Sequence, residues 1–137
     1  EAVETVRGDA SQVDAFVNEV LRLDSPLQRN PRRVVALTKK WCDDELDVGD
    51  HILVFLGAAN MDPAVFDSPD IFRLGREAKP LTFGSGIHYC LGTTLVKVEM
   101  RAALQCLLRR FNAIKISGCH RLVDVDVGNW GFKELLV

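Results

Sequence analysis

One cysteine stands in a setting that could make its sulfur reactive. Cys90 lies in the segment Phe83-Gly84-Ser85-Gly86-Ile87-His88-Tyr89-Cys90-Leu91-Gly92, and an apolar helical pattern begins directly after it. Backbone N–H groups in the first turn of a helix are unpaired and carry the positive end of the helix dipole, so a sulfur placed there is favoured as the thiolate. The thiolate is the form of cysteine that binds a metal ion. Cys90 is therefore the first candidate ligand in this chain.

Glycines in the Cys90 segment have a physical use beside such a ligand. Gly84, Gly86 and Gly92 lack a Cβ atom, so the backbone can approach a flat group closely, and a positive φ would turn amides towards the sulfur. Phe83 could shield the sulfur from water, which matters because the dielectric around a ligating thiolate tunes the potential of its metal. For a lone cysteine, burial as an inert core residue would still be favoured by about ten to one.

Two predicted helices would hold this segment in place. The first follows the capping-box pattern of residues 11–14 and should end near Asp24, because Pro26 disfavours the helical conformation at Ser25. Its apolar stripe is Val13, Phe16, Val17, Val20 and Leu21. The second helix should run from the Cys90 segment to about Phe111. Its predicted buried stripe is Val96, Met100, Ala103, Leu104, Leu107 and Phe111, with Lys97, Arg101, Gln105 and Arg109 on the wetter face.

Shorter elements are predicted around these helices. Residues 33–37 and 47–56 are rich in β-branched types and separated by turn residues, which favours short strands. Residues 60–80 carry Pro and Gly without sustained periodicity and indicate a long irregular coil, a feature that is uncommon unless it is functional. The tail alternates apolar and polar residues, for example over 122–127, and predicts small hairpins. The predicted fold is α+β, mainly helical, with residues 1–137 forming a single unit.

Composition excludes several other classes of protein. The chain of 137 residues has the usual size of one domain. Its 17 Lys plus Arg and 19 Asp plus Glu leave a net charge of −2, which gives too weak an electrostatic field to recruit nucleic acid. No apolar run approaches the roughly 18 residues of a spanning helix, so no membrane partner is expected. Cysteines at positions 42, 90, 106 and 119 form no C-x-x-C pair, which disfavours a zinc site and fits free thiols in a reducing, cytoplasmic compartment.

A family resemblance favours Cys90 as a metal ligand over an inert core cysteine. The run F-x-x-G-x-H-x-C-x-G, present here as Phe83, Gly86, His88, Cys90 and Gly92, resembles the haem-binding signature of cytochromes P450. The resemblance implies that Cys90 is the thiolate ligand of the iron in haem b, and that Phe83 and the neighbouring glycines, Gly84 included, belong to the haem cradle. It assigns no catalytic acid or base to these residues.

Another segment follows the order of that family. Glu19-Val20-Leu21-Arg22 resembles the E-x-x-R of its K helix, whose Glu and Arg are structural and hold the coil beneath the haem. A third basic partner is expected near residues 69–72, where Ile71 occupies the slot. Either Arg73 substitutes for that partner or the third contact is missing.

Two side chains resemble the propionate donors of the family. Arg32 stands six residues after Pro26, as in similar bacterial-type members, and His88 lies in the Cys90 segment. A dianionic cofactor edge needs such donors, although on sequence alone each residue could equally be an ordinary exposed side chain. Met61 departs from the family pattern, because it replaces the Arg of an A-N-R-D-P segment.

The resemblance implies the C-terminal part of the fold of a soluble, bacterial-type cytochrome P450: K helix, short β strands, meander coil, Cys-ligand loop, L helix and terminal hairpins. The part with the long I helix and its acid-alcohol pair is expected to be absent from these residues. The implied function of the parent enzyme is a haem-thiolate monooxygenase. It would take electrons from a ferredoxin or flavoprotein reductase, activate O₂ and insert one oxygen atom into an apolar small molecule.

Other interpretations stay open. The chain could be a remnant that binds haem without catalysis or serves in interactions, or a small α+β domain whose Cys90 binds nothing. Cys106 is predicted to pack in the core. Lys97, Arg101 and Arg109 could meet an electron donor or simply form a solvated face. The remaining candidates for a metal site, Cys42, Cys119 and His120, lack a second pair of ligands.

Overall fold

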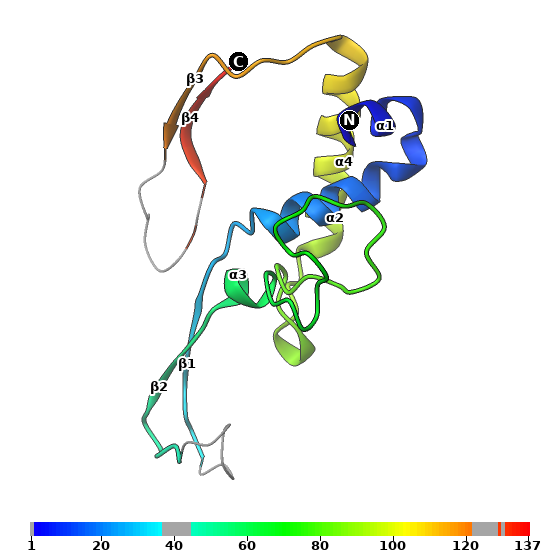
Figure 1. Cartoon of the computed structure of the whole chain (residues 1–137). Coiled ribbons are helices and arrows are strands. Elements are labelled where there is room, and N and C mark those ends of the chain that lie inside the picture. The colour runs from blue at the N-terminus through cyan, green and yellow to red at the C-terminus, as the bar shows by residue number, and fades with distance from the viewer. Residues whose placement is uncertain (1, 37–44, 122–128, 130) are drawn as a thin grey trace.

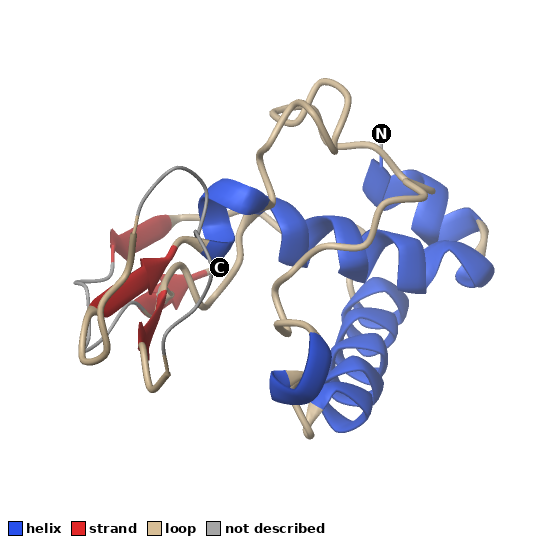
Figure 2. Cartoon of the chain, turned by 90° about the horizontal axis from the view of Figure 1, so that it is seen from below, coloured by secondary structure: helices blue, strands red, loops and turns tan. Residues whose placement is uncertain are grey.

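The computed structural model describes residues 2–36, 45–121, 129 and 131–137 of the chain. Its three longer helices gather on one side of the molecule and its two β hairpins lie on the other, with the shortest helix next to the hairpins (Figure 1; Figure 2). The elements in chain order are α1 (Ala2–Gly8), the 3-10 turn η1 (Ala10–Gln12), α2 (Val13–Leu23), β1 (Asn30–Arg33), β2 (His51–Val54), α3 (Leu56–Ala59), the 3-10 turn η2 (Gly86–His88), α4 (Thr93–Arg110), β3 (Gly118–Arg121) and β4 (Phe132–Leu136). The predicted class, α+β and mainly helical, is confirmed.

The first predicted helix is present as α2, with its apolar stripe facing the core. It ends at Leu23 with Asp24 as C-cap, as the Pro26 signal predicts. The expected capping box does not form, because η1 precedes the helix and Asp9 accepts from the backbone N–H of Ser11 instead. The buried core consists of Val6, Val13, Val17, Leu21 and Leu108, with Phe16, Phe83, Met100 and Leu104 packed against it.

Helix α1 was not predicted from the sequence. Val6 is its one buried residue, so its seven residues show too short an apolar pattern to be recognised. Its contacts are tertiary: the guanidinium of Arg7 donates to the carbonyls of Leu108, Phe111 and Asn112. Arg7 thereby pairs one carbonyl of the last turn of α4 and two carbonyls just beyond the helix.

Helix α4 has the predicted extent, but its predicted buried stripe is confirmed only at Met100 and Leu104. Leu108 is buried and Met100 and Leu104 pack against the core, whereas Leu107 and Phe111 are each 44% exposed. Ala103 is exposed as well. The prediction that Cys106 is a packed core thiol is also wrong, because Cys106 is exposed. Helix α2 covers only one narrow face of α4, and the sequence pattern could not indicate which face that is.

The strands form two separate antiparallel hairpins. β1 pairs with β2 from Asn30↔Val54 to Arg33↔His51, so the first strand begins three residues before the predicted range. β3 pairs with β4, and an isolated bridge between Leu27 and Asn129 joins the two regions of β structure. The predicted alternation at residues 122–127 lies outside the described residues.

A long coil connects α3 to the Cys90 segment. From residue 60 to residue 85, all of them described, the chain forms neither helix nor strand, which confirms the predicted irregular segment. Within the described part of the chain, no helix has the length and apolar character needed to cross a membrane.

Candidate functional site

The Cys90 segment is a loop whose two ends are joined by a hydrogen bond. The backbone N–H of Cys90 donates to the carbonyl of Phe83 at 2.9 Å. Gly84 and Gly86 have φ values of 72° and 62°, so the predicted left-handed conformation is present at these two glycines. A Cβ atom at Gly84 would lie 3.3 Å from the carbonyl oxygen of His88, which is a tight contact across the loop. The loop therefore depends on glycine for both its turn and its width.

The exposed thiol of Cys90 belongs to a segment that also exposes two apolar side chains. Cys90 is exposed, and its neighbours Ile87 and Leu91 are 97% and 101% exposed. A Cβ atom on Gly92 would lie 3.8 Å from the sulfur, so the backbone beside the thiol stays narrow. A flat, largely apolar group placed on the sulfur would cover these side chains and remove them from water. The residues present thus fit a haem.

Phe83 connects this loop to the core. Its ring packs against the core at the margin, and the ammonium group of Lys97 lies 6.0 Å from the ring centroid. This contact is within the range of a cation–π interaction. The shielding of the Cys90 sulfur by this ring stays a prediction.

Glu19 and Arg22 form a buried, two-pronged ion pair on α2. Nε of Arg22 donates to Oε2 of Glu19 at 2.9 Å and Nη2 donates to Oε1 at 2.8 Å. Their side chains are 4% and 1% exposed. Nη1 of Arg22 donates to the carbonyl of Asn60 at 2.9 Å, and the guanidinium lies 5.2 Å from the ring centroid of Phe66. The pair is consistent with a structural role, since its atoms are committed to contacts with the coil.

The third basic partner of this pair is Arg76, which corrects the sequence prediction. Nε of Arg76 donates to Oε1 of Glu19 at 2.9 Å, and the Arg76 side chain is only 6% exposed. Arg73 supplies its backbone N–H to the same oxygen at 3.1 Å, whereas its guanidinium pairs with Asp67. Ile71 contributes its carbonyl, which accepts from Nη2 of Arg76 at 2.8 Å. Arg76 stands three residues beyond the substitute proposed from the sequence, and an aperiodic coil gives no spacing that could have singled it out.

The carboxylate of Glu19 is kept ionised by these partners. Burial by itself raises the pKa of Glu19, but the hydrogen bonds from Arg22, Arg76 and the Arg73 N–H outweigh it. The net result is a pKa below the ordinary value of 4.5. The ion-pair cluster therefore carries its full charge at neutral pH.

A buried amide, missed in the sequence, connects this cluster to the Cys90 loop. Asn60 is fully buried, and its Oδ1 accepts from the backbone N–H of Leu81 at 2.6 Å. Its Nδ2 donates to Oγ1 of Thr82 at 3.2 Å, and that hydroxyl donates to the carbonyl of Leu21 at 2.7 Å. Asn60 also accepts from Arg22 through its own carbonyl. The two residues before Phe83 are thus fixed to α2 and α3.

The two predicted propionate donors are placed differently. Arg32 lies on β1, where its Nη1 donates to Oδ1 of Asn30 at 2.6 Å and to the carbonyl of Pro31 at 2.8 Å. His88 ends η2 and is exposed beside Cys90. Among the described residues, no hydrogen bond joins Arg32 to the Cys90 loop. The assignment of Arg32 and His88 to the haem propionates remains a prediction.

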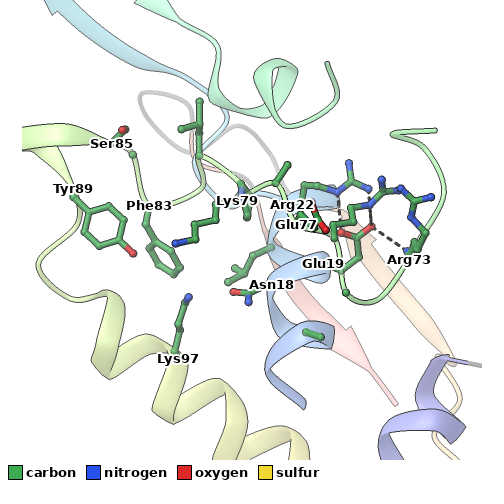
Figure 3. Close-up of a pocket in the computed structure, with 18 of the residues that line it drawn as sticks. Asn18, Glu19, Arg22, Arg73, Glu77, Lys79, Phe83, Ser85, Tyr89 and Lys97 are labelled. Atoms are coloured by element: carbon green, nitrogen blue, oxygen red, sulfur yellow. Dashed lines mark hydrogen bonds and ion pairs between the residues drawn. The ribbon is translucent and has the colours of Figure 1, made fainter. Parts of the chain in front are cut away.

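A cavity of about 760 Å³ lies between α2, the coil, the loop and α4. Glu19 and Arg22 line it at one end, and Phe83 and Tyr89 line it at the other (Figure 3). The side chains of Lys79 and Lys97 are both directed towards the ring of Phe83 (Figure 3). This cavity places a positively charged surface next to the loop that carries the thiol.

Comparisons with known proteins agree on one family. The model of the cytochrome P450 family matches residues 9–121. Cytochrome P450 144 of Mycobacterium tuberculosis is 36% identical over 127 residues, which make up 91% of this chain and 27% of that protein. The chain therefore spans about a quarter of the length of that relative.

Solved structures of cytochromes P450 match almost the whole chain. P450BioI, in complex with hexadec-9Z-enoic acid ligated acyl carrier protein, has a TM-score of 0.88 and 32% identity, and covers 96% of this chain and 34% of its own. CYP109E1 from Bacillus megaterium, in complex with testosterone, has a TM-score of 0.88 and 28% identity, and covers 97% of this chain and 37% of its own.

The family model, the relative and the solved structures agree with the local geometry of the chain. A cysteine loop with two left-handed glycines stands before a long helix, and a buried Glu-Arg pair binds the coil that leads to it. The chain belongs to the cytochrome P450 family.

Proposed function

We propose that the protein carrying this chain is a haem-thiolate monooxygenase, and that residues 1–137 act in it as one unit that holds the iron through Cys90. The observation that carries the proposal is the exposed thiol between the fully exposed apolar side chains of Ile87 and Leu91. Exposed apolar groups of this size next to a thiol favour a large apolar ligand over a solvated surface. When bound, haem supplies the oxygen-activating chemistry, which thiolate ligation favours.

Other residues of the chain would hold the haem and limit the access of water to the sulfur. Phe83, with Gly84, Gly86 and Gly92, would form the wall and floor beside the sulfur and limit its contact with water. His88 and Arg32 would donate to the haem propionates. Arg32 has the means to do so, because its hydrogen bonds to described residues, Asn30 and Pro31, use only Nη1 and leave the other guanidinium N–H groups available for such an acceptor.

An apolar small molecule is the proposed substrate. Two neighbours in structure were solved with apolar ligands, testosterone in one and a hexadecenoic acid on acyl carrier protein in the other. We further propose that the protein works in the cytoplasm, where a reducing environment keeps the thiol of Cys90 free.

The proposed electron donor is an acidic ferredoxin or a flavoprotein reductase that docks over the cavity beside Phe83. Lys79 and Lys97 point into this cavity, and neither forms an ion pair with any residue that the structure describes. Unpaired ammonium groups around a concave surface attract an acidic partner and accelerate its association. Arg101 is a weaker candidate than its sequence position indicates, because its guanidinium donates to Asp14 at 2.9 Å.

The proposal is tested on the protein expressed from its complete reading frame and loaded with haem. Reduction and treatment with carbon monoxide should give the red-shifted Soret band of thiolate ligation. Cys90→Ser should abolish this band. The matched control Cys106→Ser should retain it, since Cys106 is an exposed thiol on α4, beyond the loop.

Three outcomes would contradict parts of the proposal. Equal spectra from the wild type and Cys90→Ser would remove Cys90 as the ligand, and a histidine-type band would do the same. A thiolate band without donor-dependent oxygen consumption, tested against a panel of apolar substrates, would favour a haem-binding protein without catalysis.

A further inference from the structure

Thr93 is the first residue of α4 and stands three positions after the proposed ligand. Its side chain is almost fully buried, with the residue 6% exposed. Its hydroxyl Oγ1 donates to the carbonyl oxygen of Cys90 at 2.8 Å, and its backbone N–H donates to the same oxygen at 3.3 Å. The shorter of the two bonds is therefore made by the side chain.

Both peptide groups around Cys90 are consequently held. On one side, the Cys90 N–H donates to the carbonyl of Phe83 at 2.9 Å. On the other side, the Cys90 carbonyl is held by Thr93. Two fixed peptide planes fix φ and ψ of the residue between them, and these angles set the direction of its Cα–Cβ bond. The direction of the Cα–Cβ bond, from which the sulfur extends, is thus set by the contacts of Cys90 with Phe83 and Thr93.

The beginning of α4 offers no other side chain for this task. Gly92 is the N-cap and provides no side-chain hydrogen bond. The first backbone bond within the helix runs from the Val96 N–H to the Gly92 carbonyl at 3.0 Å, so it does not reach Cys90. Without the hydroxyl, the Cys90 carbonyl would keep only the longer bond from the Thr93 N–H.

We propose that Thr93 is a positioning residue for the iron ligand: its hydroxyl holds the Cys90 carbonyl and so keeps the Cα–Cβ bond of Cys90 in the direction that brings the sulfur to the iron. This inference rests on the proposed function, because it assumes that Cys90 binds haem. A threonine hydroxyl bonded to a carbonyl three residues back can also be a purely local feature of a helix start. The two roles differ in what they change, since a local role alters helix stability and a positioning role alters thiolate ligation.

The test compares three substitutions in the haem-loaded protein expressed from its complete reading frame. Thr93→Val keeps the shape and removes the donor, Thr93→Ser keeps the donor, and Thr94→Val is a control at the adjacent exposed position. The measured quantities are the equilibrium ratio of thiolate-type to thiol-type Soret bands in the reduced carbon monoxide complex, the midpoint potential of the iron, and the urea unfolding midpoint.

We expect Thr93→Val to lower the thiolate-to-thiol ratio by about three- to tenfold, as one lost hydrogen bond predicts. Thr93→Ser should restore the wild-type ratio, and Thr94→Val should leave it unchanged. An unchanged ratio and potential in a folded Thr93→Val protein would overturn the inference, even if its unfolding midpoint fell. Absence of the thiolate band from the wild type itself would overturn the proposed function together with this inference. The two failures can be told apart, because failure of the proposed function is seen in the wild type, before any substitution is made.

Discussion

Oε1 of Glu19 accepts from Nε of Arg76 at 2.9 Å, although the two residues are 57 positions apart in the chain. The same oxygen also accepts from Arg22 and from the Arg73 N–H. One carboxylate oxygen of α2 thus gathers three donors, two of which come from the coil. The coil has no regular hydrogen bonding of its own over residues 60–85, so these contacts have an unusual share in fixing its course.

Arg76→Ala is therefore expected to destabilise the protein strongly. The substitution removes one partner of a buried ion pair and the Arg76 hydrogen bonds to three carbonyls, those of Asp67, Ser68 and Ile71. The Ile71 carbonyl keeps another donor, Arg22, at 3.4 Å, and the Ser68 carbonyl keeps the Ile71 N–H at 3.0 Å. We expect a loss of about 2–4 kcal/mol in the free energy of unfolding, measured by urea denaturation. The matched control is Arg73→Ala, since the Arg73 guanidinium makes an exposed pair with Asp67 and should contribute less than about 1 kcal/mol. Similar losses from both substitutions would contradict the assignment of Arg76 as the third partner.

The same cluster predicts a dependence of stability on pH. The pKa of Glu19 is lower in the folded protein than its ordinary 4.5, because Arg22, Arg76 and the Arg73 N–H overcome the effect of burial. A depressed folded pKa means that the stabilisation is complete above the unfolded pKa and is lost as the pH falls through the folded value. Urea unfolding between pH 6 and roughly pH 3 should show this loss below about pH 4.5. In Glu19→Gln the slope should be shallower, at a lower overall stability, and a slope equal to that of the wild type would argue against Glu19 as its source.

Thr82→Val should loosen the start of the Cys90 loop. The Thr82 hydroxyl accepts from Asn60 and donates to the Leu21 carbonyl, and all three groups are buried. Removing it leaves a buried donor and a buried acceptor unpaired, which should cost about 2–3 kcal/mol in the free energy of unfolding. Thr82→Ser retains the hydroxyl and should recover most of that loss. If the serine variant were no more stable than the valine variant, packing of the methyl group would outweigh the hydrogen bonds.

The features that the sequence could predict are those coded locally. The Cys90 loop depends on glycines within the loop, and α2 depends on an apolar repeat and on Pro26, so both could be read from neighbouring residues. Arg76 could not be identified, because the direction of an irregular coil is decided by the carboxylate it meets. The buried face of α4 was only partly predicted for a related reason: its apolar residues lie on several faces, and α2 packs against one of them. Helix α1 depends on Arg7 reaching the end of α4, a contact between residues about 100 positions apart.

Charge reversal at Lys97 tests the proposed docking surface. Lys97 lies over the Phe83 ring and lines the cavity, so Lys97→Glu should repel an acidic electron donor without touching Cys90. We expect the association rate with the donor to fall about tenfold at low ionic strength, and the difference from the wild type to shrink as salt is added. Stopped-flow reduction of the iron at several donor concentrations measures this rate, while the carbon monoxide spectrum verifies that thiolate ligation is intact. Arg109→Glu serves as the control for net charge, because Arg109 is an exposed cation that does not line the cavity. An equal effect of the two substitutions would show that the donor responds to the overall charge of the protein and not to this cavity.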